Sequence, residues 1–351
     1  MTTAQPLPFG PQWKIRSDMA APIDFNSISR GLTEIGRGGE GLVYLVQSMP
    51  NMVFKEFKKF PGHTPNRIAL EEIINLPTKM EASERQWIME RTTWPLQLVT
   101  RGANLCGFMM PVITNDFFRM HGARIAPKKV TCEWNYLSMR ERFRTNQNIH
   151  SEIPQLSPVD ALKVVGDLAR TMEILHKYDM VIGDVSGRNL LWTDRPAPRV
   201  LVIDVDSFHF EGKTGVASPK QSPDWDDPYL GPNNNFTTKA SDKYKLALAA
   251  YRGVWAATTD RPDPTKSAVP SCPHGVPDSV RDLVTRGLGP VDNRPEAREW
   301  VEAIQTAMRF GGRPTVTIDQ TGPSQRPTRA VGDREPTASV ARPVIKMKPT
   351  T

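Results

Sequence analysis

Hydrophobic positions in the first third of the chain come in short runs, interrupted by one helical pattern. The runs have the length and the flanking turn residues that are typical of strands. They lie at 32–36 (LTEIG), 42–47 (LVYLVQ), 52–57 (MVFKEF), 94–99 (WPLQLV) and 106–113 (CGFMMPVI). Between them, the segment 66–76 (NRIALEEIINL) places Ile68, Glu72 and Leu76 on one helical face. The pattern over residues 31 to 113 therefore predicts a small sheet with one helix.

After Thr114 the spacing of apolar residues becomes helical. Residues 157–179 (SPVDALKVVGDLARTMEILHKYD) give the clearest helix, with Ser157 as the N-cap and Pro158 at the first helical position. Further helices are expected at 241–256, 277–288 and 295–310. A Pro-, Gly- and Asn-rich stretch at 210–238 precedes them, and it is too long for an ordinary connection. Strands followed by helices predict an α+β protein.

The composition is that of a globular protein, with 351 residues of which 38% are hydrophobic and 24% are charged. No apolar run approaches the roughly 18 residues that a membrane-spanning helix needs. The first residues have neither the basic nor the apolar region of a secretory signal. The three cysteines, Cys106, Cys132 and Cys272, have no metal-ligand spacing, which argues against a zinc site and a disulfide framework. We expect idle thiols in a cytoplasmic protein that has no membrane association.

The net charge of +7 is concentrated at the C-terminal end of the chain. Residues 313–351 contain seven basic and three acidic residues, so they carry +4 and leave +3 for all the others. The nearly balanced remainder argues against a nucleic-acid-binding surface. Because the segment is rich in Pro, Thr and Arg and has no aromatic residue, we expect a disordered tail over 312–351. Such a tail serves docking or phosphorylation, or is a solvated appendage.

A glycine cluster lies between the first two predicted strands. It reads GRGGEGLV at 36–43, with Gly36, Gly38 and Gly41 in the spacing G-x-G-x-x-G-x-V that ends at Val43. Glycine is required where the backbone approaches phosphates closely or makes a sharp turn. A dinucleotide-binding site would need a helix directly afterwards, whereas a strand pattern follows here. The cluster therefore indicates a nucleotide-covering loop or an ordinary hairpin.

A lysine follows this loop inside an apolar strand. Lys55 is costly to bury without an anion, which can be a nucleotide phosphate or a carboxylate. The helix at 66–76 offers Glu71 and Glu72, and we prefer Glu72 because it shares a face with Ile68 and Leu76. The alternative is a lysine at a strand edge that reaches solvent.

Acidic and amide side chains recur after the long helix. Asp184 and Asn189 stand five residues apart in the segment 175–192 (LHKYDMVIGDVSGRNLLW). Fifteen residues after Asn189, an apolar strand ends in Asp204, within the run Asp204-Val205-Asp206. Asp206 is the alternative residue for the role of Asp204.

These motifs, in this order, resemble the eukaryotic-like protein kinases, and most of all divergent bacterial members of the serine/threonine branch. The resemblance covers about residues 31 to 310 and includes a helix start at Ser241-Asp242, an Arg-Pro motif at Arg294 and an activation-segment end near Asn233. It implies a two-lobed fold with a small antiparallel-sheet lobe at 31–113 and a mostly helical lobe at 114–311. An irregular segment at 1–30 and the tail at 312–351 would flank them.

The resemblance also implies an ATP- and Mg²⁺-dependent protein kinase, with a role for each site residue. The backbone of Gly36, Gly38 and Gly41, with Val43, would cover ATP, and Lys55, held by Glu72, would bind its phosphates. Asn189 and Asp204 would bind Mg²⁺, and Asp184 would be the catalytic base. The backbone of Met110 and Val112 would meet adenine, unless this segment is a plain core strand. The partner would be a protein substrate, with autophosphorylation included.

Several positions depart from the family pattern. Ile182-Gly183 replaces His-Arg before Asp184, Ser186 replaces the usual lysine, and Arg188 matches the tyrosine-kinase pattern. Val205-Asp206 replaces Phe-Gly. Asn233 replaces the glutamate that usually pairs with Arg294, so we expect that pair to be lost. These changes leave two alternatives open, a nucleotide-binding pseudokinase scaffold and a small-molecule phosphotransferase. The preference for Ser/Thr over Tyr also stays open, and residues 115–150 carry no motif, with Trp134, Tyr136 and Leu137 expected in the core.

Overall fold

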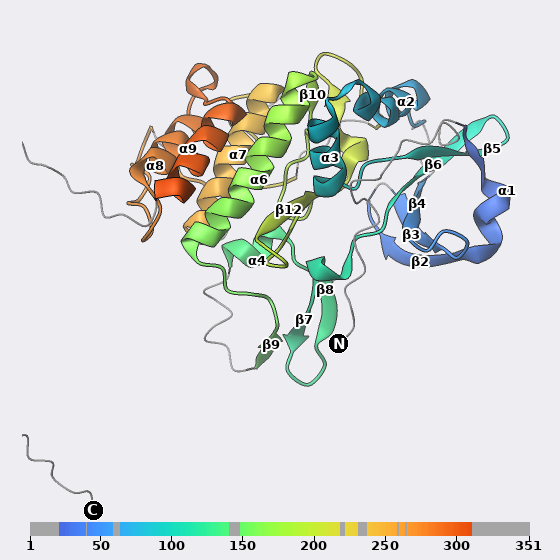
Figure 1. Ribbon diagram of the computed structural model, residues 1–351, viewed down its shortest axis with the longest axis horizontal. Coiled ribbons are helices and arrows are strands. Elements are labelled where there is room, and N and C mark those ends of the chain that lie inside the picture. Colours follow the sequence, from blue (N-terminus) through green and yellow to red (C-terminus); the bar gives the residue numbers. More distant parts are fainter. Residues whose placement is uncertain are drawn as a thin grey trace, which may run out of the picture. The chain divides into compact units, whose positions relative to one another are not determined.

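A six-stranded sheet forms the first part of the structure, which is a computed structural model (Figure 1). Its strand order is β1-β5-β6-β4-β3-β2. Neighbouring strands are antiparallel, except that β1 runs parallel to β5. The strands are β1 (Ile23–Asp24), β2 (Leu32–Arg37), β3 (Gly41–Val46), β4 (Met52–Phe57), β5 (Gln97–Arg101) and β6 (Asn104–Pro111). The mixed α+β class with an antiparallel sheet agrees with the sequence prediction.

The structure describes residues 21–39, 41–58, 64–139, 148–217, 222–230, 237–257, 260–263 and 265–310. The described residues of Met1–Gly312 belong to one compact unit. The predicted tail at 312–351, Asn233 and most of the predicted irregular segment at 1–30 lie outside the described residues. Within the described part, no helix is both long enough and apolar enough to span a membrane.

The helices beside the sheet differ from the sequence prediction in two ways. The predicted helix is present as α2 (Arg67–Asn75), but its buried residues are Ala69, Leu70 and Ile73, while Ile68 is 70% exposed. A further helix, α3 (Ala82–Arg91), was not predicted because its sequence, ASERQWIMER, is polar and buries few apolar residues. A short helix, α1 (Phe25–Ile28), precedes the sheet strands β2 to β6.

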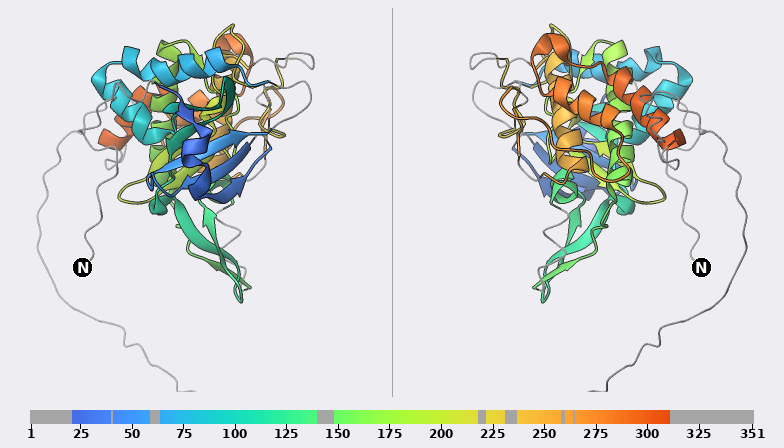
Figure 2. Two further views of the ribbon diagram at one scale, coloured as in Figure 1. Left: turned by 90° about the vertical axis from the view of Figure 1, so that its right-hand side faces the viewer. Right: turned by 90° about the vertical axis from the view of Figure 1, so that its left-hand side faces the viewer.

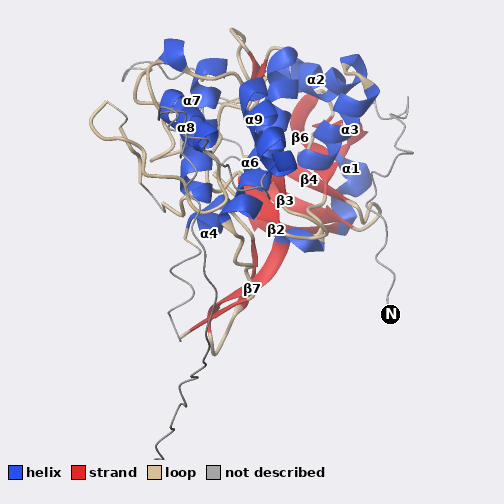
Figure 3. Cartoon of the chain, turned by 60° about the vertical axis from the view of Figure 1, so that its left-hand side comes forward, coloured by secondary structure: helices blue, strands red, loops and turns tan. Residues whose placement is uncertain are grey.

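Helices dominate the second part of the structure, where α6, α7, α8 and α9 lie together (Figure 3). The central helix is α6 (Pro158–Lys177), which packs against α7 (Lys239–Val254) and α9 (Ala297–Phe310). The Ser157 hydroxyl accepts a hydrogen bond from the Asp160 amide at 3.1 Å, which confirms the predicted N-cap. The helix α8 (Asp278–Gly287) packs against α7 and α9. The four predicted helices are thus confirmed, and their apolar faces build the main core.

A three-stranded sheet occupies the region for which the sequence predicts only helical periodicity. It consists of β7 (Phe118–Ala123), β8 (Lys128–Thr131) and β9 (Ile149–Ser151), in the order β8-β7-β9, and it projects away from the helices (Figure 2). The helix α4 (Trp134–Ser138) follows β8. Trp134 and Leu137 are fully buried, and Tyr136 is partly buried against the core, as predicted for core residues.

Two short antiparallel pairs hold the chain between α6 and α7. The strand β11 (Leu190–Thr193) pairs with β12 (Arg199–Val202), and β10 (Met180–Val181) pairs with β13 (His209–Phe210). The loop that carries Asp184 and Asn189 therefore leaves β10 and enters β11. The run Asp204–Asp206 follows β12, so both acidic stretches start from paired, buried strands.

Candidate active site

One cavity of about 860 Å³ collects most of the residues that the sequence singled out. The sheet contributes the glycine turn between β2 and β3 and one residue of β4. The helical part contributes the loop after β10 and the turn after β12. The predicted site residues that line the cavity are Gly36, Gly38, Gly41, Val43, Lys55, Asp184, Asn189 and Asp204. Residues separated by up to 168 positions in the sequence thus share one space.

The glycine turn is closed by its own backbone. The Gly38 amide donates to the Gly41 carbonyl at 2.9 Å, and the register of β2 against β3 shifts between Glu34 and Gly36. A Cβ atom at Gly41 would lie 2.6 Å from the Glu56 carbonyl oxygen, so only glycine fits against β4 there. This close approach explains one of the three predicted glycines by packing alone.

Lys55 is buried in β4, with 4% of its surface exposed. Its ammonium group donates to a carboxylate oxygen of Asp206 at 2.6 Å and to one of Asp204 at 3.3 Å. It also lies 5.9 Å from the centre of the Phe108 ring on the neighbouring strand β6. The expectation that a buried lysine here needs an anion is therefore met, by aspartates of the turn after β12.

The predicted contact between Lys55 and Glu72 is replaced by other pairs. The Glu72 carboxylate accepts from Lys213 at 2.9 Å, and Glu71 accepts from Arg67 at 2.8 Å. The reason is the orientation of α2. Its buried face is the one with Leu70 and Ile73, so the face that Glu72 shares with Ile68 is turned toward solvent.

Asp184 and Asn189 are joined by hydrogen bonds within their loop. The Asn189 side-chain amide donates to the Asp184 carbonyl and to a carboxylate oxygen of Asp184, both at 2.9 Å. The amide oxygen of Asn189 is thereby directed away from Asp184. The other carboxylate oxygen of Asp184 accepts from the Ser222 hydroxyl at 2.8 Å and from the Ser222 amide at 3.2 Å. Sequence reasoning missed Ser222, because no local pattern links it to a residue 38 positions away.

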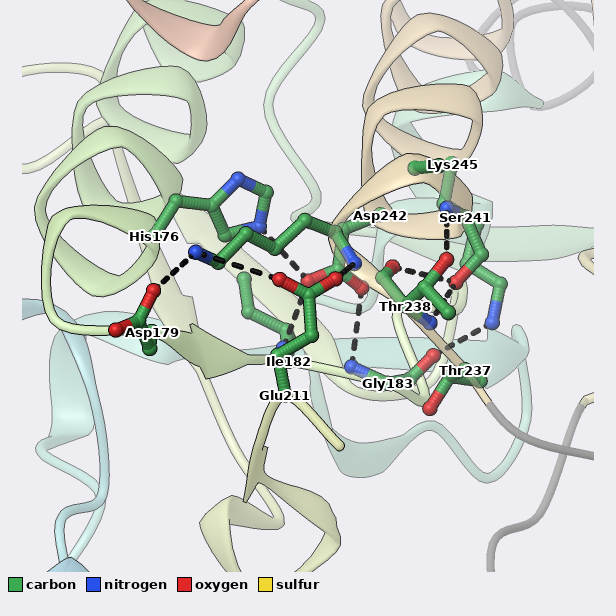
Figure 4. A network of polar contacts seen from close by, with 12 residues as sticks. His176, Asp179, Ile182, Gly183, Glu211, Thr237, Thr238, Ser241, Asp242 and Lys245 are labelled. Carbon is green, nitrogen blue, oxygen red and sulfur yellow. Dashed lines mark hydrogen bonds and ion pairs between the residues drawn. The ribbon is translucent and has the colours of Figure 1, made fainter. Parts of the chain in front are cut away.

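The loop before Asp184 is anchored on α7 by a buried polar network (Figure 4). The Asp242 carboxylate accepts from the amides of Ile182 and Gly183, at 2.7 and 3.0 Å, and contacts the His176 ring at 3.0 Å. The Lys245 ammonium donates to the Gly183 carbonyl at 2.5 Å. Burial lowers the pKa of Lys245, and the nearby carboxylates of Asp242 and Asp184 oppose that shift. The helix start predicted at Ser241-Asp242 is found two residues earlier, at Lys239, and Asp242 is fully buried in the first turn of α7.

Gly183 has a backbone reason to replace the arginine of the family pattern. Its φ is +77°, a conformation that favours glycine. A Cβ atom there would also lie 2.9 Å from the Thr237 hydroxyl. The departure at this position is therefore required by the geometry of the loop.

The expected loss of a partner for Arg294 is wrong. Asp227 accepts two hydrogen bonds from the guanidinium group, and both side chains are fully buried. Arg294 also donates to the carbonyls of Gly289 and Ala240. The sequence motif had assigned the partner of Arg294 to position 233, six residues after Asp227. The stretch between the two positions follows no regular period, so no sequence pattern indicated that Asp227 takes this place.

The two predicted adenine contacts are not among the described residues that line the cavity. The Val112 amide donates to the Asn51 carbonyl at 3.1 Å, and Met110 lies opposite Val53 in the β4–β6 pair. The reading of this segment as a core strand, left open by the sequence, describes these contacts better.

Four charged side chains that line the cavity were not predicted as site residues, namely Arg37, Glu133, Arg188 and Lys213. Glu133 is the second residue after β8. Burial raises the pKa of Glu133, and Arg188, which also lines the cavity, opposes that shift. Lys213 forms an ion pair with Glu72, which is not among the described residues that line the cavity.

The oxygen atoms at the cavity fit a small hard cation. Among the described residues, no group of three or more His, Cys, Asp or Glu side chains is arranged to hold a metal by itself. Asp204 and Asn189 offer one carboxylate and one amide oxygen, and the Asp204 side chain is 46% exposed. Mg²⁺ is usually held by one or two such ligands together with water and phosphate oxygens. The donor set therefore fits Mg²⁺ bound with a nucleotide.

Comparison with known proteins gives a distant match. No model of a known protein family matches the chain. Over 183 residues, half of this chain, it is 25% identical to protein kinase YegI of Escherichia coli strain K12, and equally similar to protein kinase YegI of Escherichia coli O157:H7. The match covers 22% and 23% of these relatives, so the chain spans less than a quarter of their length. Sequence similarity thus supports a kinase-like relationship over half of the chain.

Proposed function

We propose that this protein is an ATP- and Mg²⁺-dependent protein kinase that transfers the γ-phosphoryl group to a protein Ser or Thr hydroxyl. The observation that carries the proposal is the single cavity lined by Lys55, Asp184, Asn189 and Asp204 together with the glycine turn. Phosphoryl transfer needs positioning and charge neutralisation more than covalent chemistry, and these groups provide both.

Each residue has a task that follows from its place. Lys55 puts a buried positive charge at the cavity wall, where it binds phosphate oxygens. Asp204 and Asn189 hold Mg²⁺, which supplies charge neutralisation of the phosphates when bound. Asp184, fixed by the Asn189 amide and by Ser222, orients the acceptor hydroxyl and takes its proton.

The cellular location belongs to the same proposal. In the described part of the chain, Cys106, Cys132 and Cys272 form no disulfide, and Cys106 and Cys132 are buried. Reduced cysteines fit a reducing compartment, and we propose the cytoplasm.

The test is incubation of the purified protein with radiolabelled ATP, with and without Mg²⁺, followed by phosphosite mapping. Lys55→Met and Asp184→Asn should each lower transfer by at least about a hundredfold, in the range that removal of a positioned catalytic group produces. Asp278→Asn, on the exposed start of α8, is the control that should keep full activity.

Three outcomes would contradict the proposal. Retained transfer in Asp184→Asn would refute the assigned base. ATP binding without transfer in the wild type would favour a pseudokinase scaffold. Transfer to small hydroxyl compounds but not to proteins would favour a small-molecule phosphotransferase.

A further inference from the structure

We propose that Asp206 is the residue that positions Lys55 toward the nucleotide phosphates. The sequence resemblance assigns this role to a carboxylate of the helix α2, Glu72. This inference rests on the proposed function, since it names how the phosphate-binding lysine of that site is held. It assigns a role to the aspartate that stands where the family pattern has glycine.

The distances and burial favour Asp206 over the neighbouring carboxylates. Asp206 lies 2.6 Å from the Lys55 ammonium and its side chain is fully buried, whereas Asp204 lies 3.3 Å away and is 46% exposed. The Lys55 side chain itself is 5% exposed. The electrostatic attraction between the Lys55 ammonium and the Asp206 carboxylate is strong, because little solvent screens two charges at a buried site.

The local backbone explains how Asp206 reaches β4. Asp204 has φ +60° and ψ +46°, and one turn of 3₁₀ helix, Val205–Ser207, starts directly after it. The Ser207 amide donates to the Asp204 carbonyl at 3.0 Å, and Phe208, which is fully buried, donates to the Val205 carbonyl at 2.9 Å. The turn is thus anchored in the core on both sides of Asp206, which fixes its carboxylate against Lys55.

Asp204 and Asp206 then have separate roles, one at the cavity and one at Lys55. Asp204 lines the cavity, whereas Asp206 is not among the described residues that line it. Asp206 therefore contacts the Lys55 ammonium without occupying the cavity wall. When Asp204 takes Mg²⁺, Lys55 keeps an anionic partner. The carboxylates of α2 are engaged elsewhere, because Glu72 pairs with Lys213 and Glu71 with Arg67.

The first experiment compares Asp206→Asn with Glu72→Gln, two charge-neutralising changes of equal size. Binding of ATP and of adenosine to each variant is measured in the presence of Mg²⁺. Asp206→Asn should weaken ATP binding about tenfold or more and change adenosine binding less than about twofold, since loss of a buried charge partner misplaces only the phosphate-binding group. Glu72→Gln should change both affinities less than about twofold, as expected for an exposed pair. The reverse ranking of the two variants would overturn the inference.

The second experiment tests the pair without any nucleotide. Unfolding midpoints are measured for Asp206→Asn, Lys55→Met and the double variant. Asp206→Asn removes the nearer and buried carboxylate and leaves the Lys55 ammonium with the partly exposed Asp204 at 3.3 Å. The added Lys55→Met change removes that ammonium, so the double variant should be more stable than Asp206→Asn alone. Additive losses of stability would overturn the inference. If Asp206→Asn does not fold, recovery of folding in the double variant supports the pair and failure to recover overturns it.

The two experiments separate this inference from the proposed function. A wild-type protein that binds no ATP would refute the proposed function, whereas the unfolding experiment would still report whether Asp206 and Lys55 are coupled. A wild-type kinase whose ATP affinity depends on Glu72 and not on Asp206 would leave the proposed function standing and refute the inference.

Discussion

The buried ion pair between Asp227 and Arg294 allows a sharp prediction about stability. Asp227→Asn keeps the size of the side chain and removes its charge. Arg294 then keeps its hydrogen bonds to the carbonyls of Gly289 and Ala240, but it loses its anionic partner in a place where both side chains are fully buried. Asp226→Asn, one residue earlier, is the matched control, because its partner Arg261 is 28% exposed and Asp226 itself is 47% exposed.

The structure sets the size of the expected difference. Removing one partner of a buried pair costs about 3–5 kcal/mol, and the remaining backbone acceptors of Arg294 place Asp227→Asn near the lower end. A partly exposed pair such as Asp226–Arg261 contributes about 0–1 kcal/mol, the range of solvent-accessible ion pairs. At about 2–3 °C per kcal/mol for a chain of this size, Asp227→Asn should lower the unfolding midpoint by roughly 6–9 °C and Asp226→Asn by less than about 3 °C.

The assay is thermal unfolding at neutral pH and moderate salt, followed by circular dichroism. Added salt should narrow the loss caused by Asp226→Asn and leave that of Asp227→Asn unchanged, because salt screens exposed charges far more than buried ones. Equal losses in the two variants, or a salt-sensitive loss in Asp227→Asn, would refute the reasoning that burial decides the value of this pair.

Two further predictions test the glycine turn and a buried thiol. Gly41→Ala should lower the unfolding midpoint and raise the KM for ATP at least severalfold, because its Cβ atom would lie 2.6 Å from the Glu56 carbonyl. Gly39→Ala, whose Cβ atom would meet no atom within 4 Å, should leave the midpoint unchanged, and equal effects of the two would contradict this account. Burial raises the pKa of the Cys132 thiol to about 11, so the folded protein at pH 8 has only about one in a thousand of these thiols deprotonated. Mass spectrometry after iodoacetamide treatment should find Cys132 unlabelled in the folded protein and labelled after unfolding, and rapid labelling of the folded protein would contradict the burial.

Hydrophobic patterns located the elements that bury most of their apolar residues. The helix α6 and the strand β4 were found where the sequence placed them, and both pack their apolar residues into a core. The strand β2 was also found at the predicted place, although it has no buried residue and its Ile35 is 51% exposed. The helix α3 was not predicted because polar residues dominate its sequence. The sheet β7-β8-β9 was not predicted because it lies outside the main core. Both failures arise where packing contributes least to the choice of residues.

Periodicity was less reliable for the direction in which α2 faces. The spacing of Ile68, Glu72 and Leu76 is helical, and so is that of Leu70 and Ile73. Both stripes satisfy the same 3.6-residue period. Leu76, in the turn directly after α2, is buried, whereas Ile68 at the other end of the predicted stripe is exposed, so only the packing shows which face of α2 itself is buried. Glu72 was assigned to the cavity because the wrong face of α2 was taken as buried. The predicted partner of Lys55 was wrong for the same reason.

Burial energetics and local spacing answer different questions about a charged residue. A lysine in an apolar strand and an arginine in a core position both require an anion, and the structure provides one for Lys55 and for Arg294. Which anion it is depends on segments 151 and 67 residues away, so the family spacing pointed to Glu72 and Asn233 where the structure has Asp206 and Asp227. That a buried charge has a counter-charge can therefore be predicted more reliably than which residue supplies it. The need for a counter-charge is a property of the buried site itself, whereas several segments around that site are able to supply the carboxylate.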